Sequence, residues 1–264
     1  MRNLLTLKQT ALSHVYNLFF VASDDYVHVY KPSFPKQELS PTPQWVFRPP
    51  ATNTAHYSGI DRRNPHSINH LHIANVGDEE WVAMACDDGD IVCFRTRAFE
   101  EAINDYDGCD CDPSPWQPHA CHLQPEPCAH WNVLRSAWGL SVHTRARMIA
   151  TSSNLHEITV FSLALHSATS DEEDSNSFDH EVLDRSRDQK FRLPRADHNI
   201  PSISFCNTDD DPHARWIMGC DVIRTVYIWD VHNAQMVQRI QAGFCVNPTS
   251  PECECPYEVD ASGE

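Results

Sequence analysis

The fold of this chain is decided by Trp216-Ile-Met-Gly-Cys220 and Thr225-Val-Tyr-Ile-Trp-Asp230, two runs of mainly apolar residues separated by a polar turn that begins at Asp221. Apolar and polar residues largely alternate in these runs, and β-branched and aromatic residues are frequent, which is typical of strands. A short polar segment between two such strands reverses the chain direction, so the sequence predicts a β-hairpin.

Three further copies of this hairpin precede it. They lie at residues 18–22 with 26–30, 81–86 with 91–94, and 148–151 with 157–161. Alignment on the closing aromatic residue places Tyr30, Phe94, Phe161 and Trp229 in register, at spacings of 64, 67 and 68 residues. Such a spacing indicates an internal repeat.

Additional strands are predicted around the hairpins. The expected first strands lie at 68–74, 138–143 and 200–205, the expected outer strands at 44–47 and 189–193, and a short helix at 96–104. Four-stranded units repeated around an axis are the architecture of a β-propeller. We therefore predict an all-β β-propeller of about four degenerate blades over residues 11–240. Long loops are inserted at 104–127 and 166–188, and an acidic, disordered tail occupies 241–264. Because four blades make an incomplete propeller, self-association through open sheet edges is also expected.

The fourth copy resembles a WD40 repeat most clearly. His198 precedes its first strand, and Trp229-Asp230 closes its third. In the second copy, Asp88 occupies the turn position, where WD40 blades carry an aspartate. The resemblance implies that these four residues join a buried hydrogen-bond network, so we interpret Trp229, Asp230, His198 and Asp88 as structural rather than ligand-binding.

Charge and composition exclude several classes of protein. The formal net charge is 20 − 37 = −17, and no basic stripe of the kind that follows a phosphate backbone is apparent, so no direct nucleic-acid partner is expected. The eight glycines are too far apart for phosphate-binding loops. No apolar run reaches the ~20 residues of a membrane helix. Polar residues also interrupt the first 23 residues, so we expect a protein of the nucleus or cytoplasm, not a secreted one.

The first insert could carry metal chemistry. It gathers Cys109, Cys111, Cys121 and Cys128 with His119, His122 and His130. Zinc binding is an open alternative, but structural zinc sites favour cysteine pairs spaced C-x₂₋₄-C, which this segment lacks. A cysteine-rich loop is the preferred interpretation, with no metal, cofactor or catalytic residue, and we predict no enzyme activity. The basic segment 185–195 is interpreted as an outer strand, with a nuclear-import signal or a phosphate contact as the alternatives.

A more specific resemblance comes from longer stretches. Ser136-Ala-Trp-Gly-Leu-Ser-Val-His143, Arg147-Met-Ile-Ala-Thr-Ser-Ser-Asn-Leu-His-Glu-Ile-Thr-Val-Phe161 and His198-Asn-Ile-Pro-Ser-Ile-Ser-Phe205 are similar to the fungal WD40-like family named for constitutive transcription of ribonucleotide reductase genes. The resemblance implies a non-enzymatic scaffold that regulates this transcription through protein partners. Members are also linked to cullin-type ubiquitin ligases as substrate receptors. Transcription components and ubiquitin-ligase components are therefore both expected as partners.

Overall fold

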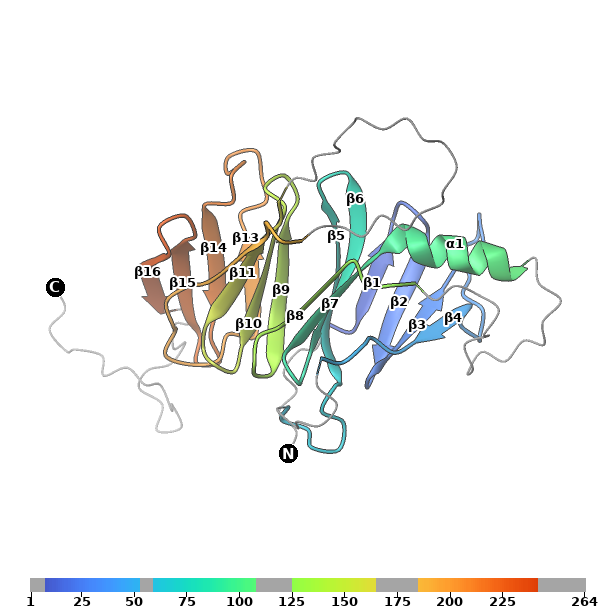
Figure 1. Cartoon of the computed structure of the whole chain (residues 1–264), viewed down its shortest axis with the longest axis horizontal. Helices are drawn as coiled ribbons and strands as arrows, with labels where there is room; N and C mark the ends of the chain where they lie inside the picture. Colours follow the sequence, from blue (N-terminus) through green and yellow to red (C-terminus); the bar gives the residue numbers. More distant parts are fainter. Residues whose placement is uncertain (1–7, 53–58, 108–124, 165–184, 242–264) are drawn as a thin grey trace, which may run out of the picture.

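The chain folds into four antiparallel sheets of four strands each, seen side by side in Figure 1. The computed structural model describes residues 8–52, 59–107, 125–164 and 185–241. Within each sheet the strands follow one another in sequence order, which is the arrangement of a propeller blade. The all-β, WD40-like prediction is confirmed.

The four blades divide the described chain in order. Blade 1 holds β1 (Thr10–Ser13), β2 (Leu18–Ser23), β3 (Tyr26–Tyr30) and β4 (Trp45–Phe47). Blade 2 holds β5 (Ile68–Val76), β6 (Glu79–Cys86), β7 (Asp90–Arg95) and β8 (Ala129–Asn132). Blade 3 holds β9 (Ala137–His143), β10 (Met148–Ser153), β11 (Ile158–Ser162) and β12 (Gln189–Arg192). Blade 4 holds β13 (Ser202–Phe205), β14 (Trp216–Cys220), β15 (Thr225–Asp230) and β16 (Gln235–Gln241).

The predicted hairpins, outer strands and helix all occur in the structure. The helix is α1 (Thr96–Asp107), which follows β7. The strands described here lie between residues 10 and 241. Gln241, the first residue of the predicted tail, is instead the last residue of β16. The rest of that tail, 242–264, and the central parts of both inserts, at 108–124 and 165–184, lie outside the described residues.

One alignment differs from the structure by a single residue. Phe94, Phe161 and Trp229 are buried, but Tyr30 is half-buried and its neighbour Val29 is the buried residue, opposite Phe20. Two residues separate the paired Ser23 and Tyr26 at the turn of blade 1, whereas five separate the last paired residues in the other three hairpins. Because side chains alternate along a strand, this shorter turn moves Tyr30 to the opposite face.

The blades pack face to face, and each junction has its own apolar core. The core between blades 1 and 2 includes Phe20, Val29 and Phe94, and α1 extends it. Phe99 of α1 is fully buried, and its ring lies 5.4 Å from that of Phe20 in an edge-to-face arrangement. The helix therefore locks the first two blades together. In the part of the chain that the structure describes, no helix is both long and apolar enough to cross a membrane.

Candidate functional site

Trp229 and Asp230 hold blade 4 together. The Trp229 ring is buried and stacks against Tyr227 at 5.5 Å, while its Nε1–H donates to the Pro194 carbonyl at 2.9 Å. The Asp230 carboxylate accepts hydrogen bonds from Arg215 at 2.9 and 3.0 Å and from the Asn233 side chain at 2.8 Å. Burial acts to raise the pKa of Asp230, but these hydrogen bonds outweigh it and the pKa is lowered. Trp229 thus contacts its own blade and the segment that precedes it, whereas Asp230 contacts residues of its own blade.

His198 lies beside the turn of blade 4, and its side chain is 46% exposed. Its Nδ1 is 3.7 Å from Oδ2 of Asp221, the first residue after β14. That carboxylate accepts hydrogen bonds from the Tyr227 hydroxyl at 3.0 Å and from the Thr225 amide at 2.7 Å. Asp221 is therefore the first residue of the blade 4 turn, two residues before the position that aligns with Asp88, and the sequence reading assigned it no role. Its place directly after an apolar strand was the available signal.

Asp88 contacts a histidine that the sequence reading missed. Its Oδ2 lies 2.6 Å from Nδ1 of His66, and Nε2 of His66 lies 3.1 Å from the Pro49 carbonyl. Burial acts to lower the pKa of His66, but the hydrogen bond to Asp88 and the charges of Asp88 and Asp90 outweigh it, so the pKa is raised. His66 stands two residues before a predicted first strand, much as His198 does, and that position was the signal.

Asp90 ties blade 2 to the segment that connects it with blade 1. It accepts hydrogen bonds from the Thr52 amide at 2.7 Å, the Thr52 hydroxyl at 2.6 Å and the Asn132 side chain at 2.7 Å. Burial acts to raise the pKa of Asp90, yet hydrogen bonds from His130, Thr52 and Asn132 lower it to about 2. The carboxylate is therefore ionised and fully bonded at neutral pH.

Replacing Asp90 with asparagine is expected to lower the free energy of unfolding at pH 7 by ~1–3 kcal/mol, because amide hydrogens would then face donors. In the parent protein, the folded pKa lies below the usual 3.8, so this contribution is present above pH 3.8 and is lost as the pH falls toward 2. Chemical denaturation of parent and variant between pH 7 and 2 measures it. The exposed Asp78→Asn change is the control, and equal losses in the two variants would contradict the prediction.

His66, Cys86 and Asp88 bring three potential metal ligands within 4.8 Å of one another. Both ring nitrogens of His66 already have hydrogen-bond partners. Burial, together with the neighbouring aspartates, raises the pKa of the Cys86 thiol well above its usual value. A cysteine binds a metal ion as the thiolate, and the raised pKa of Cys86 favours the thiol. This cluster therefore fits a structural hydrogen-bond network rather than a metal site.

The predicted Cys/His insert is only partly described. Cys109, Cys111, Cys121, His119 and His122 lie outside the described residues. Cys128 donates its S–H to the Cys93 carbonyl at 3.4 Å, and burial raises its pKa to about 12. Nε2 of His130 lies 3.1 Å from the Thr52 hydroxyl. The two described members therefore contact the blade 2 sheet and the segment before it.

The basic segment at 185–195 includes strand β12, as the preferred interpretation predicted. Arg192 lies 3.2 Å and Arg195 3.4 Å from the carboxylate oxygens of Glu157, a buried residue of the neighbouring turn. Two of its arginines thus neutralise a buried acid of the same blade.

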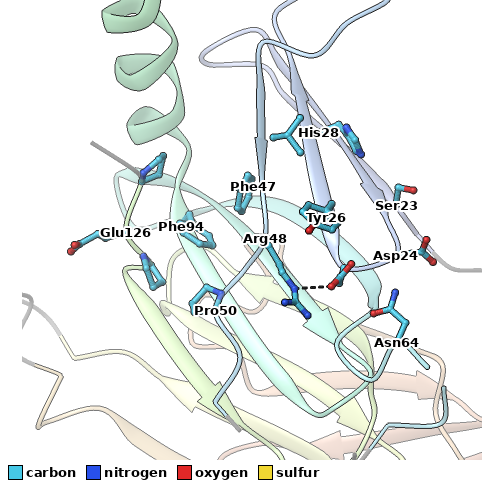
Figure 2. A pocket seen from close by; sticks show the side chains of 14 residues that line it. Ser23, Asp24, Tyr26, His28, Phe47, Arg48, Pro50, Asn64, Phe94 and Glu126 are labelled. Carbon is cyan, nitrogen blue, oxygen red and sulfur yellow. Dashed lines mark ion pairs between the residues drawn. The ribbon is translucent and has the colours of Figure 1, made fainter. Parts of the chain in front are cut away.

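A groove of about 1030 Å³ runs beside blade 1 and is the candidate binding site (Figure 2). One side is formed by β3 and the turn before it, and another by β4 and the segment that follows. Blade 2 contributes the rest. The lining residues are Ser23, Asp24, Asp25, Tyr26, His28, Val46, Phe47, Arg48, Pro50, Asn64, Phe94, Pro125, Glu126 and Pro127.

The groove combines an apolar wall with a charged rim. The rings of Phe47 and Phe94 meet edge to face at 5.2 Å, and Phe94 is held from behind by Phe99 of α1. On the rim, Arg48 Nε lies 2.7 Å from the Asp25 carboxylate, and the Arg48 side chain is 55% exposed. Figure 2 shows this ion pair beside Tyr26. Aromatic and arginine side chains of this kind are the residues most often found at the centre of protein interfaces.

Strand β4 gives the groove a second means of recognition. In the described part of the chain, β4 pairs only with β3, so its other edge has backbone groups available. An exposed sheet edge can accept an extended peptide as an additional strand, while neighbouring pockets select its side chains. The arrangement therefore suits an extended segment of another protein. The sequence reading did not find this groove, because its walls come from five separate stretches of chain.

Comparisons with known proteins identify the kind of repeat. The family model described as CRT10 matches residues 24–228. A WD40 repeat-containing protein of Dictyostelium discoideum is 32% identical over 106 residues, which are 40% of this chain and 12% of that protein. A WD repeat-containing protein of Schizosaccharomyces pombe is 24% identical over 217 residues, which are 81% of this chain and 37% of that protein. The chain thus spans well under half the length of these relatives.

A solved structure shows the same fold. A chain in the crystal structure of the mitotic checkpoint complex superposes with a TM-score of 0.50 and 10% sequence identity. The match covers 90% of this chain and 50% of that one. At this identity, the likeness concerns the fold alone.

Proposed function

The chain belongs to the CRT10 family, and on that premise we propose that it regulates transcription of ribonucleotide reductase genes as a non-enzymatic scaffold that binds other proteins. The family match and the WD-repeat relatives support a WD40-like regulatory scaffold. We propose that the protein acts in the nucleus or the cytoplasm. Fluorescence microscopy of the tagged chain tests this placement, and a secreted product would contradict it.

The observation that carries the binding role is the groove beside blade 1. Its apolar wall, exposed arginine and open strand edge favour an extended peptide over a rigid domain surface. We propose that this peptide carries apolar residues at alternate positions, which would contact Phe47 and the groove prolines, and a carboxylate beside Arg48. Rigid blades suit this role because they hold such loops in fixed positions.

Replacing both Tyr26 and Arg48 with alanine is expected to reduce recovery of specific partners at least tenfold. Interface tyrosines and arginines commonly contribute ~2 kcal/mol or more, and ~1.4 kcal/mol corresponds to a tenfold change in affinity. Quantitative mass spectrometry after affinity purification from the native cell measures recovery. Arg187→Ala, at an exposed arginine outside the groove, is the matched control. Equal recovery by the groove variant and the control would contradict the proposed site.

The identity of the recovered partners tests the proposed process. Transcription components, together with altered ribonucleotide reductase transcript levels when the chain is absent, would support the proposal. The groove variant is then expected to fail to restore those levels, while the control restores them. Recovery of cullin-ligase adaptors with unchanged transcript levels would instead favour the substrate-receptor alternative.

A further inference from the structure

One end of blades 2 and 3 has exposed arginines and aliphatic side chains that do not line the groove. Strands within a blade alternate in direction, so the turn between the second and third strands lies at the same end as the connection to the next blade. The first strands of blades 2 and 3 begin together, because the Asn69 side chain donates to the Ala137 carbonyl at 2.8 Å. These turns and connections therefore share one end of the two blades, which we call the turn face.

Hydrogen bonds join the separate stretches of the turn face. The buried Asp87 carboxylate, in the turn of blade 2, accepts hydrogen bonds from the Asp61 amide at 2.8 Å and from the Ser136 hydroxyl. The Asn154 amide, in the turn of blade 3, donates to the Ser136 carbonyl at 2.9 Å. Residues 59–64, which precede blade 2, therefore lie close to residues 133–136, which connect blades 2 and 3.

The exposed charged residues of these two stretches are all arginines. They are Arg62, Arg63 and Arg135. Within the described part of the chain, none of the three forms an ion pair with an acidic side chain. The neighbouring Asp87 carboxylate is buried beneath them and bonded within the fold. In a chain with a net charge of −17, these arginines form a local concentration of positive charge.

Two large aliphatic side chains lie among the arginines. Ile60 is 60% exposed and Leu134 is 59% exposed. Leu134 has a φ of 75°, in the left-handed region that glycine and asparagine adopt more readily than leucine. The Asn132 side-chain oxygen accepts a hydrogen bond from the Leu134 amide at 2.7 Å and holds the turn in this conformation. The turn thus keeps a large apolar side chain in water at a position where glycine would be easier, which points to a contact with a partner.

We propose that this surface binds an acidic segment of another protein in which aliphatic residues alternate with acids. The turn-face patch is defined by Ile60, Arg62, Arg63, Leu134 and Arg135. An arginine guanidinium can pair with a carboxylate through two parallel hydrogen bonds, and the aliphatic residues of the segment would cover the two exposed aliphatic side chains. A nucleic acid would satisfy the arginines but would leave these aliphatic side chains in water. None of the patch residues lines the groove, so this inference does not depend on the proposed function.

Fluorescence anisotropy of a labelled peptide of alternating glutamate and leucine, titrated with the full chain, tests the proposal. We expect saturable binding that weakens as the salt concentration rises from ~0.05 to ~0.5 M, because salt screens ion pairs at a surface. A peptide of alternating lysine and leucine has the same apolar content and the opposite charge. It is expected to bind at least ~10-fold more weakly, because complementary charge is lost.

Variants of the patch locate the binding site. The double change Arg63→Glu and Arg135→Glu is expected to weaken binding of the acidic peptide at least ~10-fold, since interface arginines commonly contribute this much. Arg145→Glu, the same charge change at an exposed arginine in the β9–β10 turn at the opposite end of blade 3, is the matched control and should bind as the parent does. Circular dichroism confirms that each variant folds.

Leu134→Gly separates binding from stability. Glycine adopts the left-handed conformation without strain, so this variant should be no less stable than the parent in chemical denaturation. Its binding of the acidic peptide is nevertheless expected to weaken, because the exposed side chain is lost. Unchanged binding by Leu134→Gly would show that the leucine is not a contact residue and would contradict the apolar part of the proposal.

Three other results would overturn the proposal. The first is no saturable binding of the acidic peptide by the parent chain, or equal binding by the charge-reversal variant and the Arg145→Glu control. The second is tighter binding of oligothymidylate than of the acidic peptide, which would assign the arginines to nucleic acid. The third is loss of binding in the Tyr26→Ala and Arg48→Ala double variant with full binding by the patch variants, which would place the peptide in the groove.

Discussion

Replacing Trp229 with alanine is expected to lower the free energy of unfolding by ~3–5 kcal/mol, the range seen when a buried tryptophan or phenylalanine is truncated. The Trp229 ring is fully buried in the core between blades 3 and 4, where it stacks on Tyr227. Its loss would leave a cavity and would also remove the hydrogen bond to the Pro194 carbonyl. This hydrogen bond joins the segment between blades 3 and 4 to the blade 4 sheet.

Chemical denaturation followed by circular dichroism measures this change, at one protein concentration for all variants because association would shift the midpoint. The Trp229→Phe variant separates the contribution of ring packing from that of the hydrogen bond to the Pro194 carbonyl. It keeps most of the buried ring but leaves the Pro194 carbonyl without its donor, so a smaller loss of ~1–3 kcal/mol is expected. Val15→Ala, at a residue 62% exposed, is the control and should change stability by less than ~0.5 kcal/mol. A Trp229→Ala variant as stable as this control would show that the ring does not hold the junction.

Replacing Asp88 with alanine is expected to cost ~3–5 kcal/mol, because removing one partner of a buried charged pair leaves the other without compensation. The His66 and Asp88 side chains are 3% and 7% exposed, and their atoms lie 2.6 Å apart. Asp88 also accepts a hydrogen bond from the Asp90 amide within the β6–β7 turn. The loss should therefore affect both the turn and the segment at Pro49 that His66 contacts.

The pH dependence of the free energy of unfolding tests whether His66 is the charged partner of Asp88. The pKa of folded His66 is raised above its usual 6.5, so its stabilising contribution is complete below pH 6.5 and is lost as the pH rises through the folded pKa. The stability difference between the parent protein and His66→Gln should consequently be larger at pH 6 than at pH 8.5. Denaturation curves of both proteins at the two pH values measure it. If the stability difference between the parent protein and His66→Gln grew with pH, the assignment to His66 would be contradicted. For the Asp88→Ala change, the control is Asp105→Ala, at an exposed position on α1.

Much of the blade structure could be predicted from the sequence because hairpins are local. Alternation along residues 216–220 and 225–230 indicates the strands, and the polar residues from Asp221 indicate the turn. Strands β14 and β15 occur at these positions with the expected pairing. The outer strand at 44–47 and the helix starting at Thr96 were predicted by the same short-range patterns. The one-residue error at Tyr30 arose because the turn length was not counted.

The partners of polar residues could not be predicted in the same way. Asp88 was recognised by its place in a turn, but its partner His66 lies 22 residues away and reaches it only after blade 2 has folded. His198, which the repeat pattern selected, is 46% exposed instead. The groove could not be predicted either, because its lining residues become neighbours only when blades 1 and 2 pack. They include Tyr26, Phe47, Phe94 and Pro125.

The sequence by itself determined the four hairpins, three first strands, two outer strands and the residues that turn the chain, because each depends on side-chain alternation and turn chemistry within about fifteen residues. It did not predict the first strand of blade 1 or the outer strands of blades 2 and 4, which are β1, β8 and β16. The tertiary structure alone decided which histidine is buried and where the candidate groove lies. These features depend on contacts between blades. An alternating strand has the same sequence pattern whichever blade covers its apolar face.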